Sequence, residues 1–80
     1  MAEVTVSDWM KVAPGIEVAC VEASNGETYT CKTINKVMGV VAKNNEARSA
    51  VKATFSGKTI TLADTGVTDH DMSLFIWGKL

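Results

Sequence analysis

The C-terminal part of the chain places large apolar residues at almost every position from Met72 to Trp77, directly after the polar turn residues 65–71. Side chains alternate between the two faces of a strand, so a strand that is apolar at consecutive positions needs cover on both faces. In a small domain this cover comes from the chain's own sheet or from a partner. The segment therefore predicts a β domain whose last strand is covered on both faces.

The size and charge of the chain favour assembly over nucleic-acid binding. Its 80 residues make one domain over residues 1–80, and a chain of this size buries roughly 60 to 65 % of its unfolded surface. Such a thin core makes assembly with other subunits a reasonable expectation. The net charge is −1 and the lysines are distributed along the whole sequence, so no basic stripe predicts a nucleic-acid surface.

No targeting or membrane segment is apparent in the sequence. The first residues, 1–5, lack the basic and apolar stretches of a secretory signal, and no apolar run is long enough to cross a membrane. We therefore expect a chain that is made in the cytoplasm and has no membrane span.

Residues 50–63 predict a β-hairpin with Ser56-Gly57 as a two-residue turn, which pairs Ala53 with Ile60 and Val51 with Leu62. This register sorts the side chains by polarity, whereas a slip of one residue would mix them. One face carries Val51, Ala53, Phe55, Ile60 and Leu62, and the other carries Lys52, Thr54, Thr59 and Thr61.

A second hairpin is indicated by Asn25-Gly26, the residue pair best suited to a type I′ turn. It pairs Val21 with Thr30 and Cys20 with Cys31. One face then holds Ile16, Val18, Cys20, Tyr29 and Cys31, although Ala19 and Val21 make the opposite face partly apolar as well. Residues 37–42 predict a third strand, in which Gly39 is a candidate bulge.

Two segments remain ambiguous between strand and helical turn. Residues 45–51 have an N-cap candidate and apolar spacing, and Ser7-Asp8 is able to cap a turn that holds Trp9. Val4 and Val6 alternate as in a strand, which suggests an N-terminal arm over residues 1–12. The expected fold is all-β, a small antiparallel β-sandwich or open barrel of five to seven strands with little helix.

The two cysteines have three interpretations. The predicted hairpin places Cys20 and Cys31 opposite each other with Cα atoms about 5.5 Å apart, a spacing that a disulfide tolerates. A chain without a secretion signal favours two reduced, buried thiols that act as small core residues. A bridge formed after release from the cell and a metal site are the alternatives.

Asp69-His70-Asp71, with Asp64 upstream, is the cluster that most resembles a functional site. On an extended chain the two aspartates of the tripeptide point to one side and His70 to the other, so three ligands do not converge without help from elsewhere. A polar turn explains these residues, because Asp side chains bond backbone groups and Gly66 supplies a positive φ. A divalent-ion site at a subunit contact is the alternative, and catalysis is a more distant one.

The sequence carries no other catalytic signature. The sequence has one histidine and no G-x-S-x-G motif, and its glycine pairs lack the spacing and lysine of a phosphate loop. We therefore expect no enzyme, no cofactor and no metal. The aromatic residues predict either core and subunit contacts or, in an OB-like barrel, a stacking platform for single-stranded nucleic acid; they are Trp9, Tyr29, Phe55, Phe75 and Trp77.

Five segments spread over most of the chain resemble short all-β structural proteins of bacterial viruses. They are residues 8–12, residues 16–21, the Thr-rich strand 56–62, the turn 66–71 and Trp77-Gly78. The shared outline is an N-terminal arm, hairpins, a Thr-rich strand, a Gly/Thr/Asp turn and a terminal apolar strand. The resemblance implies a virion component, such as a capsid decoration or minor capsid protein, and it transfers no catalytic residue.

The sequence thus predicts a non-enzymatic structural protein that acts through repeated contacts with its own copies, as a homo-oligomer, or with a larger protein shell. It would be made in the host cytoplasm and be located in the virion. The candidate subunit contacts are Val4, Val6, Trp9, Phe75 and Trp77. The alternative is a small OB-like nucleic-acid-binding module.

Overall fold

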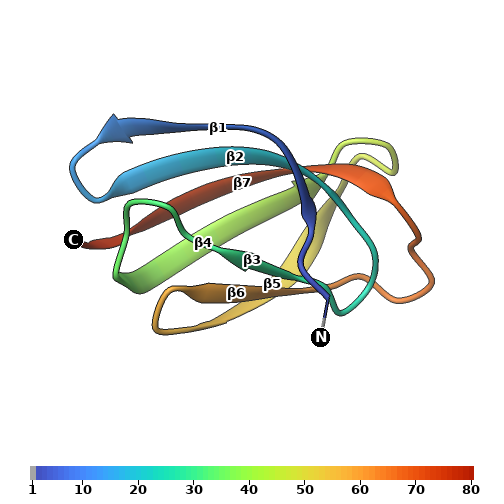
Figure 1. The fold of residues 1–80 in the computed structure, drawn as a ribbon. Helices are drawn as coiled ribbons and strands as arrows, with labels where there is room; N and C mark the ends of the chain where they lie inside the picture. Colours follow the sequence, from blue (N-terminus) through green and yellow to red (C-terminus); the bar gives the residue numbers. More distant parts are fainter. Residues whose placement is uncertain (1) are drawn as a thin grey trace.

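The computed structural model describes residues 2–80 as a curled antiparallel sheet of seven strands (Figure 1). The strands are β1 (Thr5–Ala13), β2 (Ile16–Ala23), β3 (Thr28–Thr30), β4 (Lys36–Asn44), β5 (Ser49–Ser56), β6 (Thr59–Ala63) and β7 (His70–Lys79). Their spatial order is β1-β2-β7-β4-β5-β6-β3. Within the described residues no helix is long and apolar enough to cross a membrane. The expectation of an all-β open barrel is confirmed.

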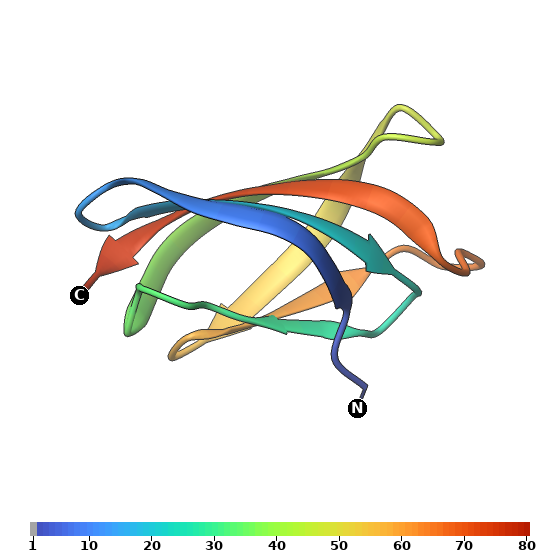
Figure 2. The ribbon, with the colours of Figure 1, turned by 45° about the horizontal axis from the view of Figure 1, so that its top comes forward.

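The sheet curls into two layers (Figure 2). Strands β1, β2, β7 and β4 form the upper layer, which lies over the lower layer of β5, β6 and β3. β7 lies between β2 and β4 and forms a long antiparallel ladder with each of them. The side chains that point inward from the two halves form one core. Its largest fully buried apolar members are Val21, Tyr29, Ile34, Ile60, Leu62, Met72, Leu74 and Ile76.

The residues before β1 close part of the gap between the two edges of the sheet. The Val4 amide donates to the Thr28 carbonyl at 2.8 Å, and the Thr28 amide donates to the Ala2 carbonyl at 3.0 Å. These bonds add a parallel bridge alongside β3, and Val4 is buried in the core. The expected arm over residues 1–12, of which Met1 lies outside the described residues, is therefore mostly sheet: residues 5–13 form β1 itself, with a bulge at Ser7 and no helical turn.

The β5–β6 hairpin forms with the predicted faces but in another register. Phe55 lies opposite Ile60, and Ala53 lies opposite Leu62, so the loop is Gly57-Lys58 and the predicted pairing of Ala53 with Ile60 is wrong. Gly57 has a φ of 60° and Lys58 does not have a positive φ, which is the pattern of a type II′ turn with glycine first.

The predicted hairpin at Asn25-Gly26 is wrong. β2 pairs with β1 and β7, and β3 pairs with β6. Gly26 has a φ of 85° whereas Asn25 does not have a positive φ, which fits a type II turn and not type I′. Type II turns splay the flanking strands. The chain therefore leaves the upper layer after β2 and joins the lower layer as β3.

The third predicted strand is confirmed and extended. β4 runs from Lys36 to Asn44, and its ladder with β7 shifts between Val37 and Gly39, as a bulge. The residues after β4, 45–48, form a turn and not a helix. The Asn44 side-chain oxygen accepts the backbone amides of Glu46 and Ala47 at 3.0 Å each, which stabilises this turn.

Candidate binding surface

Strict alternation along β7 divides its apolar residues between two environments. Met72, Leu74 and Ile76 point into the core, whereas Phe75 and Trp77 point outward and remain exposed. The chain itself does not provide the cover on both faces that the sequence predicted, because it covers only the inner face. The two outward rings lie side by side with centroids 6.1 Å apart.

The neighbouring strands extend this apolar surface across the upper layer. In the ladders, Met10 of β1, Val18 of β2, Phe75 and Val41 of β4 lie in one row. We call the solvent-facing side of these four strands the outer face; its apolar residues are Met10, Ile16, Val18, Met38, Val41, Phe75 and Trp77.

The exposure of the outer face is large for apolar side chains. Met10 and Val41 are each 59 % exposed, and Phe75 is 46 % exposed. The accessible surface of the chain is 4560 Å² for a mass of 8.5 kDa, close to the roughly 4,700 Å² expected of a folded monomer of this mass. The chain is therefore normally compact, and the exposed outer face is not the result of loose packing.

Trp77 is held on this surface by the residue opposite it. A Cβ atom added to Gly39 would lie 2.1 Å from Cζ2 of the Trp77 indole, so the indole covers the glycine closely. Gly39 is buried for the same reason. The bulge and the glycine that the sequence indicated in β4 thus serve to seat an exposed indole.

The two ends of the outer face carry opposite charges. At one end Glu22 of β2 lies directly opposite Asp71 of β7, and at the other end Lys36 of β4 lies directly opposite Lys79 of β7. All four residues are exposed. The apolar rows lie between the acidic end and the lysine end.

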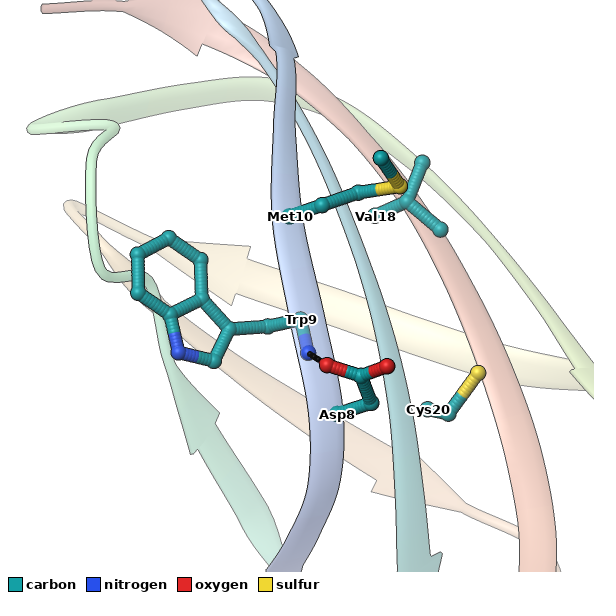
Figure 3. A pocket seen from close by; sticks show the side chains of 5 residues that line it. All are labelled: Asp8, Trp9, Met10, Val18 and Cys20. Atoms are coloured by element: carbon teal, nitrogen blue, oxygen red, sulfur yellow. Dashed lines mark hydrogen bonds between the residues drawn. The ribbon is translucent and has the colours of Figure 1, made fainter.

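A shallow hollow of about 60 Å³ lies at the β1 side of the outer face. It is lined by Asp8, Trp9, Met10, Val18 and Cys20 (Figure 3). Figure 3 shows the Trp9 indole on one side of β1 and the other four side chains on the opposite side. The hollow holds only a few water molecules and does not enclose a substrate.

The predicted arrangement of the cysteines is wrong, because Cys20 lies exposed on the outer face whereas Cys31 is buried, and both are free. Burial, assisted by the Glu17 charge and opposed by Lys58, raises the pKa of the Cys31 thiol to about 12. Cys20 faces outward because the core side of β2 is made by Glu17, Ala19, Val21 and Ala23. The sequence interpretation had assigned the opposite face of β2 to the core.

A buried carboxylate that sequence reasoning missed lies inside the barrel. Glu17 is fully buried and accepts hydrogen bonds from the Tyr29 hydroxyl, the amides of Lys32 and Thr33 and the Thr33 hydroxyl. Burial raises the pKa of this carboxyl, but the hydrogen bonds lower it by more, so the net pKa lies below its ordinary value. Burial and the nearby carboxylate raise the pKa of Tyr29, which keeps its hydroxyl protonated as a donor.

The candidate ion-site residues do not converge. The Asn44 amide nitrogen lies 2.9 Å from Asp64 Oδ2 and 3.0 Å from His70 Nδ1, so it joins these two residues. Asp69 contacts Ser24 at 3.3 Å, and the Asp71 backbone amide donates to Glu46 at 2.7 Å. In residues 2–80 no group of three or more His, Cys, Asp or Glu side chains is placed to hold a metal ion. These hydrogen bonds link the turns at this end of the barrel to one another.

The candidate subunit contacts are divided between the core, β1 and the outer face. Val4 is buried in the core and Val6 is half-buried on the inner side of β1. Trp9 is 43 % exposed on the inner side of β1, whereas Phe75 and Trp77 lie on the outer face. Among the aromatic residues of the described range 2–80 only Tyr29 is buried. The core role expected for Phe55 is not realised, because this residue is 44 % exposed.

Comparison with known proteins found no matching family model, no matching curated protein and no matching solved structure. The resemblance to structural proteins of bacterial viruses therefore stays a prediction from the sequence.

Proposed function

We propose that this chain is a non-enzymatic assembly protein and that its outer face is the surface by which it binds other subunits, either its own copies or a larger protein shell. The observation that supports this proposal most is the contiguous, exposed and apolar outer face of an otherwise compact domain. Soluble monomers rarely expose apolar patches of more than a few hundred Å², and larger patches are typical of protein–protein contacts.

The free edge of the sheet is less suited to a contact than the outer face. β1 is an edge strand of nine residues, but its pairing with β2 is interrupted by bulges next to Asp8 and Lys11. Bulges and charged side chains are the features by which natural edge strands avoid pairing with other chains. This favours packing of faces over addition of strands.

The narrower proposal, a capsid decoration or minor capsid protein in a virion, rests on the resemblance described above. It predicts that the chain is incorporated into virus particles, which mass spectrometry of particles purified from a culture that expresses the chain would test. Particles that lack the chain would overturn the virion setting and leave the assembly proposal in place.

The assembly proposal is tested by the molar mass of the chain in solution. Sedimentation equilibrium should show species heavier than the 8.5 kDa monomer at concentrations well below about 1 mM. Phe75→Ser should shift the protein toward monomer. The matched control is Phe55→Ser, because Phe55 is exposed to a similar extent, 44 % against 46 %, but does not lie on the outer face. A parent chain that remains a compact monomer at about 1 mM would overturn self-association through the outer face and leave a larger protein shell as the only proposed partner.

A nucleic-acid-binding module remains the second candidate, because Phe75 and Trp77 are exposed side by side and lysines lie at one end of the same face. Stacking of bases on such rings would quench tryptophan fluorescence. Titration with oligo(dT) at low salt, using a Trp9→Phe variant so that Trp77 alone reports, decides this point. An unchanged signal would exclude the candidate.

A further inference from the structure

We propose that the subunit bound by the outer face is a second copy of the chain, packed face to face about a two-fold axis that crosses the strands at Phe75. This inference rests on the proposed function and names the partner for it. The resulting dimer would be a β-sandwich in which the acidic end of each copy covers the lysine end of the other.

The first observation is a pair of unfavourable contacts within one copy. Glu22 and Asp71 are direct cross-strand neighbours of like charge, and so are Lys36 and Lys79. Like charges directly opposite each other destabilise a sheet. The two pairs have opposite signs and lie at the two ends of one apolar face. Their repulsion would be relieved if the acidic end of one copy lay over the lysine end of a partner.

The second observation is the symmetry of these charges along β7. Asp71 and Lys79 are each four residues from Phe75, on opposite sides of it, and all three point outward. Four residues of strand span about 13 Å. A two-fold axis that lies in the interface and crosses β7 at Phe75 therefore places Asp71 over Lys79 of the other copy, and Lys79 over its Asp71.

The same axis also pairs apolar residues with apolar residues. The row of Met10, Val18, Phe75 and Val41 runs across the strands along the axis, so each of these residues meets its own counterpart. Isologous contacts of this kind are characteristic of two-fold dimers, and packed sheets keep their strands within about 30° of each other. A standard interface of about 800 Å² per partner would cover roughly a sixth of the 4560 Å² surface.

The test uses two complementary charge variants of the full chain. The first carries Glu22→Lys and Asp71→Lys, and the second carries Lys36→Glu and Lys79→Glu. Each alone should have a dimer Kd about 100-fold higher than the parent at low salt, because both Asp71–Lys79 contacts of the dimer become repulsive and the neighbouring charges at positions 22 and 36 add to the repulsion. Mixed in equal amounts, the two variants should form a heterodimer with a Kd close to that of the parent. The effect should decrease in about 1 M salt, where charges are screened within a few ångströms.

Cysteine cross-linking provides a second measurement that does not depend on charge. In a Cys20→Ser background, a short bis-maleimide should cross-link Val41→Cys between two copies, because Val41 lies on the proposed axis. Packed sheets lie about 10 Å apart, which such a reagent spans and a direct disulfide does not. Ala50→Cys is the control, since Ala50 is also exposed on this side of β4–β5 but lies off the axis. Circular dichroism of each variant verifies that the fold is retained.

The outcomes separate this inference from the proposed function. If the parent associates through Phe75, but the mixture binds no more tightly than each charge variant alone, the two-fold arrangement is overturned and the assembly function stands. If the parent does not associate, the two-fold dimer and self-association through the outer face are both overturned, and of the proposed function only binding to a larger shell is left. Recovery of binding in the mixture, together with cross-linking at position 41 and not at position 50, is the result expected of the two-fold dimer.

Discussion

At the scale of single residues, the buried Glu17 carboxylate is the most consequential side chain of the interior. Its hydrogen-bond donors come from β3 and from the loop that leads to β4, so Glu17 links these segments of the lower layer to β2 in the upper layer. A buried charge without such donors would be strongly unfavourable. Glu17 therefore stabilises the fold through hydrogen bonds that connect segments distant in the sequence.

Replacement of this carboxylate should be costly and should alter the response to acid. Glu17→Gln turns an amide toward backbone donors, and we expect a loss of about 2–4 kcal/mol of unfolding free energy in urea denaturation. Because the pKa of Glu17 is lowered on folding, its contribution is present above the ordinary pKa of Glu and is lost as the pH falls through the lower folded pKa.

The parent should therefore lose more stability than Glu17→Gln on acidification. Glu22→Gln, which changes an exposed carboxyl, is the control and should alter the stability of the monomer by less than about 0.5 kcal/mol. Equal acid sensitivity of Glu17→Gln and the parent would show that the carboxylate is not the group responsible.

At the scale of elements, the β5–β6 hairpin shows what a sequence pattern determines. Alternating polarity fixed the two faces correctly, but it does not distinguish registers that differ by two residues, since such a shift returns every side chain to the same face. The turn decides between them. Glycine favours the first position of a type II′ loop, which selects Gly57-Lys58 over Ser56-Gly57.

The same hairpin gives a test of turn and face. Gly57→Ala should lower the unfolding free energy by about 1–2 kcal/mol, because the residue has a positive φ of 60°. Lys58→Ala, at the other loop position, should change it little. Thermal denaturation of the two variants makes the comparison, and equal effects would contradict the turn assignment.

Opposite faces of β6 should respond differently to a charge. Ile60 is fully buried, so Ile60→Asp should prevent folding, whereas Thr59 points away from the core and Thr59→Asp should be tolerated. Circular dichroism and solubility of the two variants provide the measurement. Equal sensitivity would mean that the outward side of β6 is covered as well.

β2 and β3 show why the strand pairing and the core side of β2 were not predictable from the sequence. Both faces of β2 are apolar, one with Ala19 and Val21 and the other with Ile16 and Val18, so alternation did not identify the core side. Its partners, β1 and β7, come from the two ends of the chain, and no local pattern reports such pairing. The outer face was consequently predicted only at Phe75 and Trp77, where β7 alone carries the signal.

At the scale of the whole molecule, the two ends of the chain complete the barrel. β7 supplies the centre of the upper layer, and fully burying its inward residues Met72, Leu74 and Ile76 contributes roughly 1.5–3 kcal/mol each. Deletion of residues 74–80 should therefore leave an unfolded or aggregating chain, as judged by circular dichroism and light scattering. A soluble, folded product would contradict the central position of β7.

The N-terminal residues also stabilise the barrel, because they connect β1 to β3 across the open side of the sheet. Deletion of residues 2–4 removes one buried valine and two backbone hydrogen bonds with Thr28, which together should lower the unfolding free energy by about 3–5 kcal/mol. Urea denaturation of the shortened chain measures this loss. Val4→Ser should reproduce part of it, whereas Thr5→Ser, at an exposed neighbour, should not. A shortened chain as stable as the parent would mean that residues 2–4 lie against the barrel without holding it closed, and that they are available to reach a neighbouring subunit.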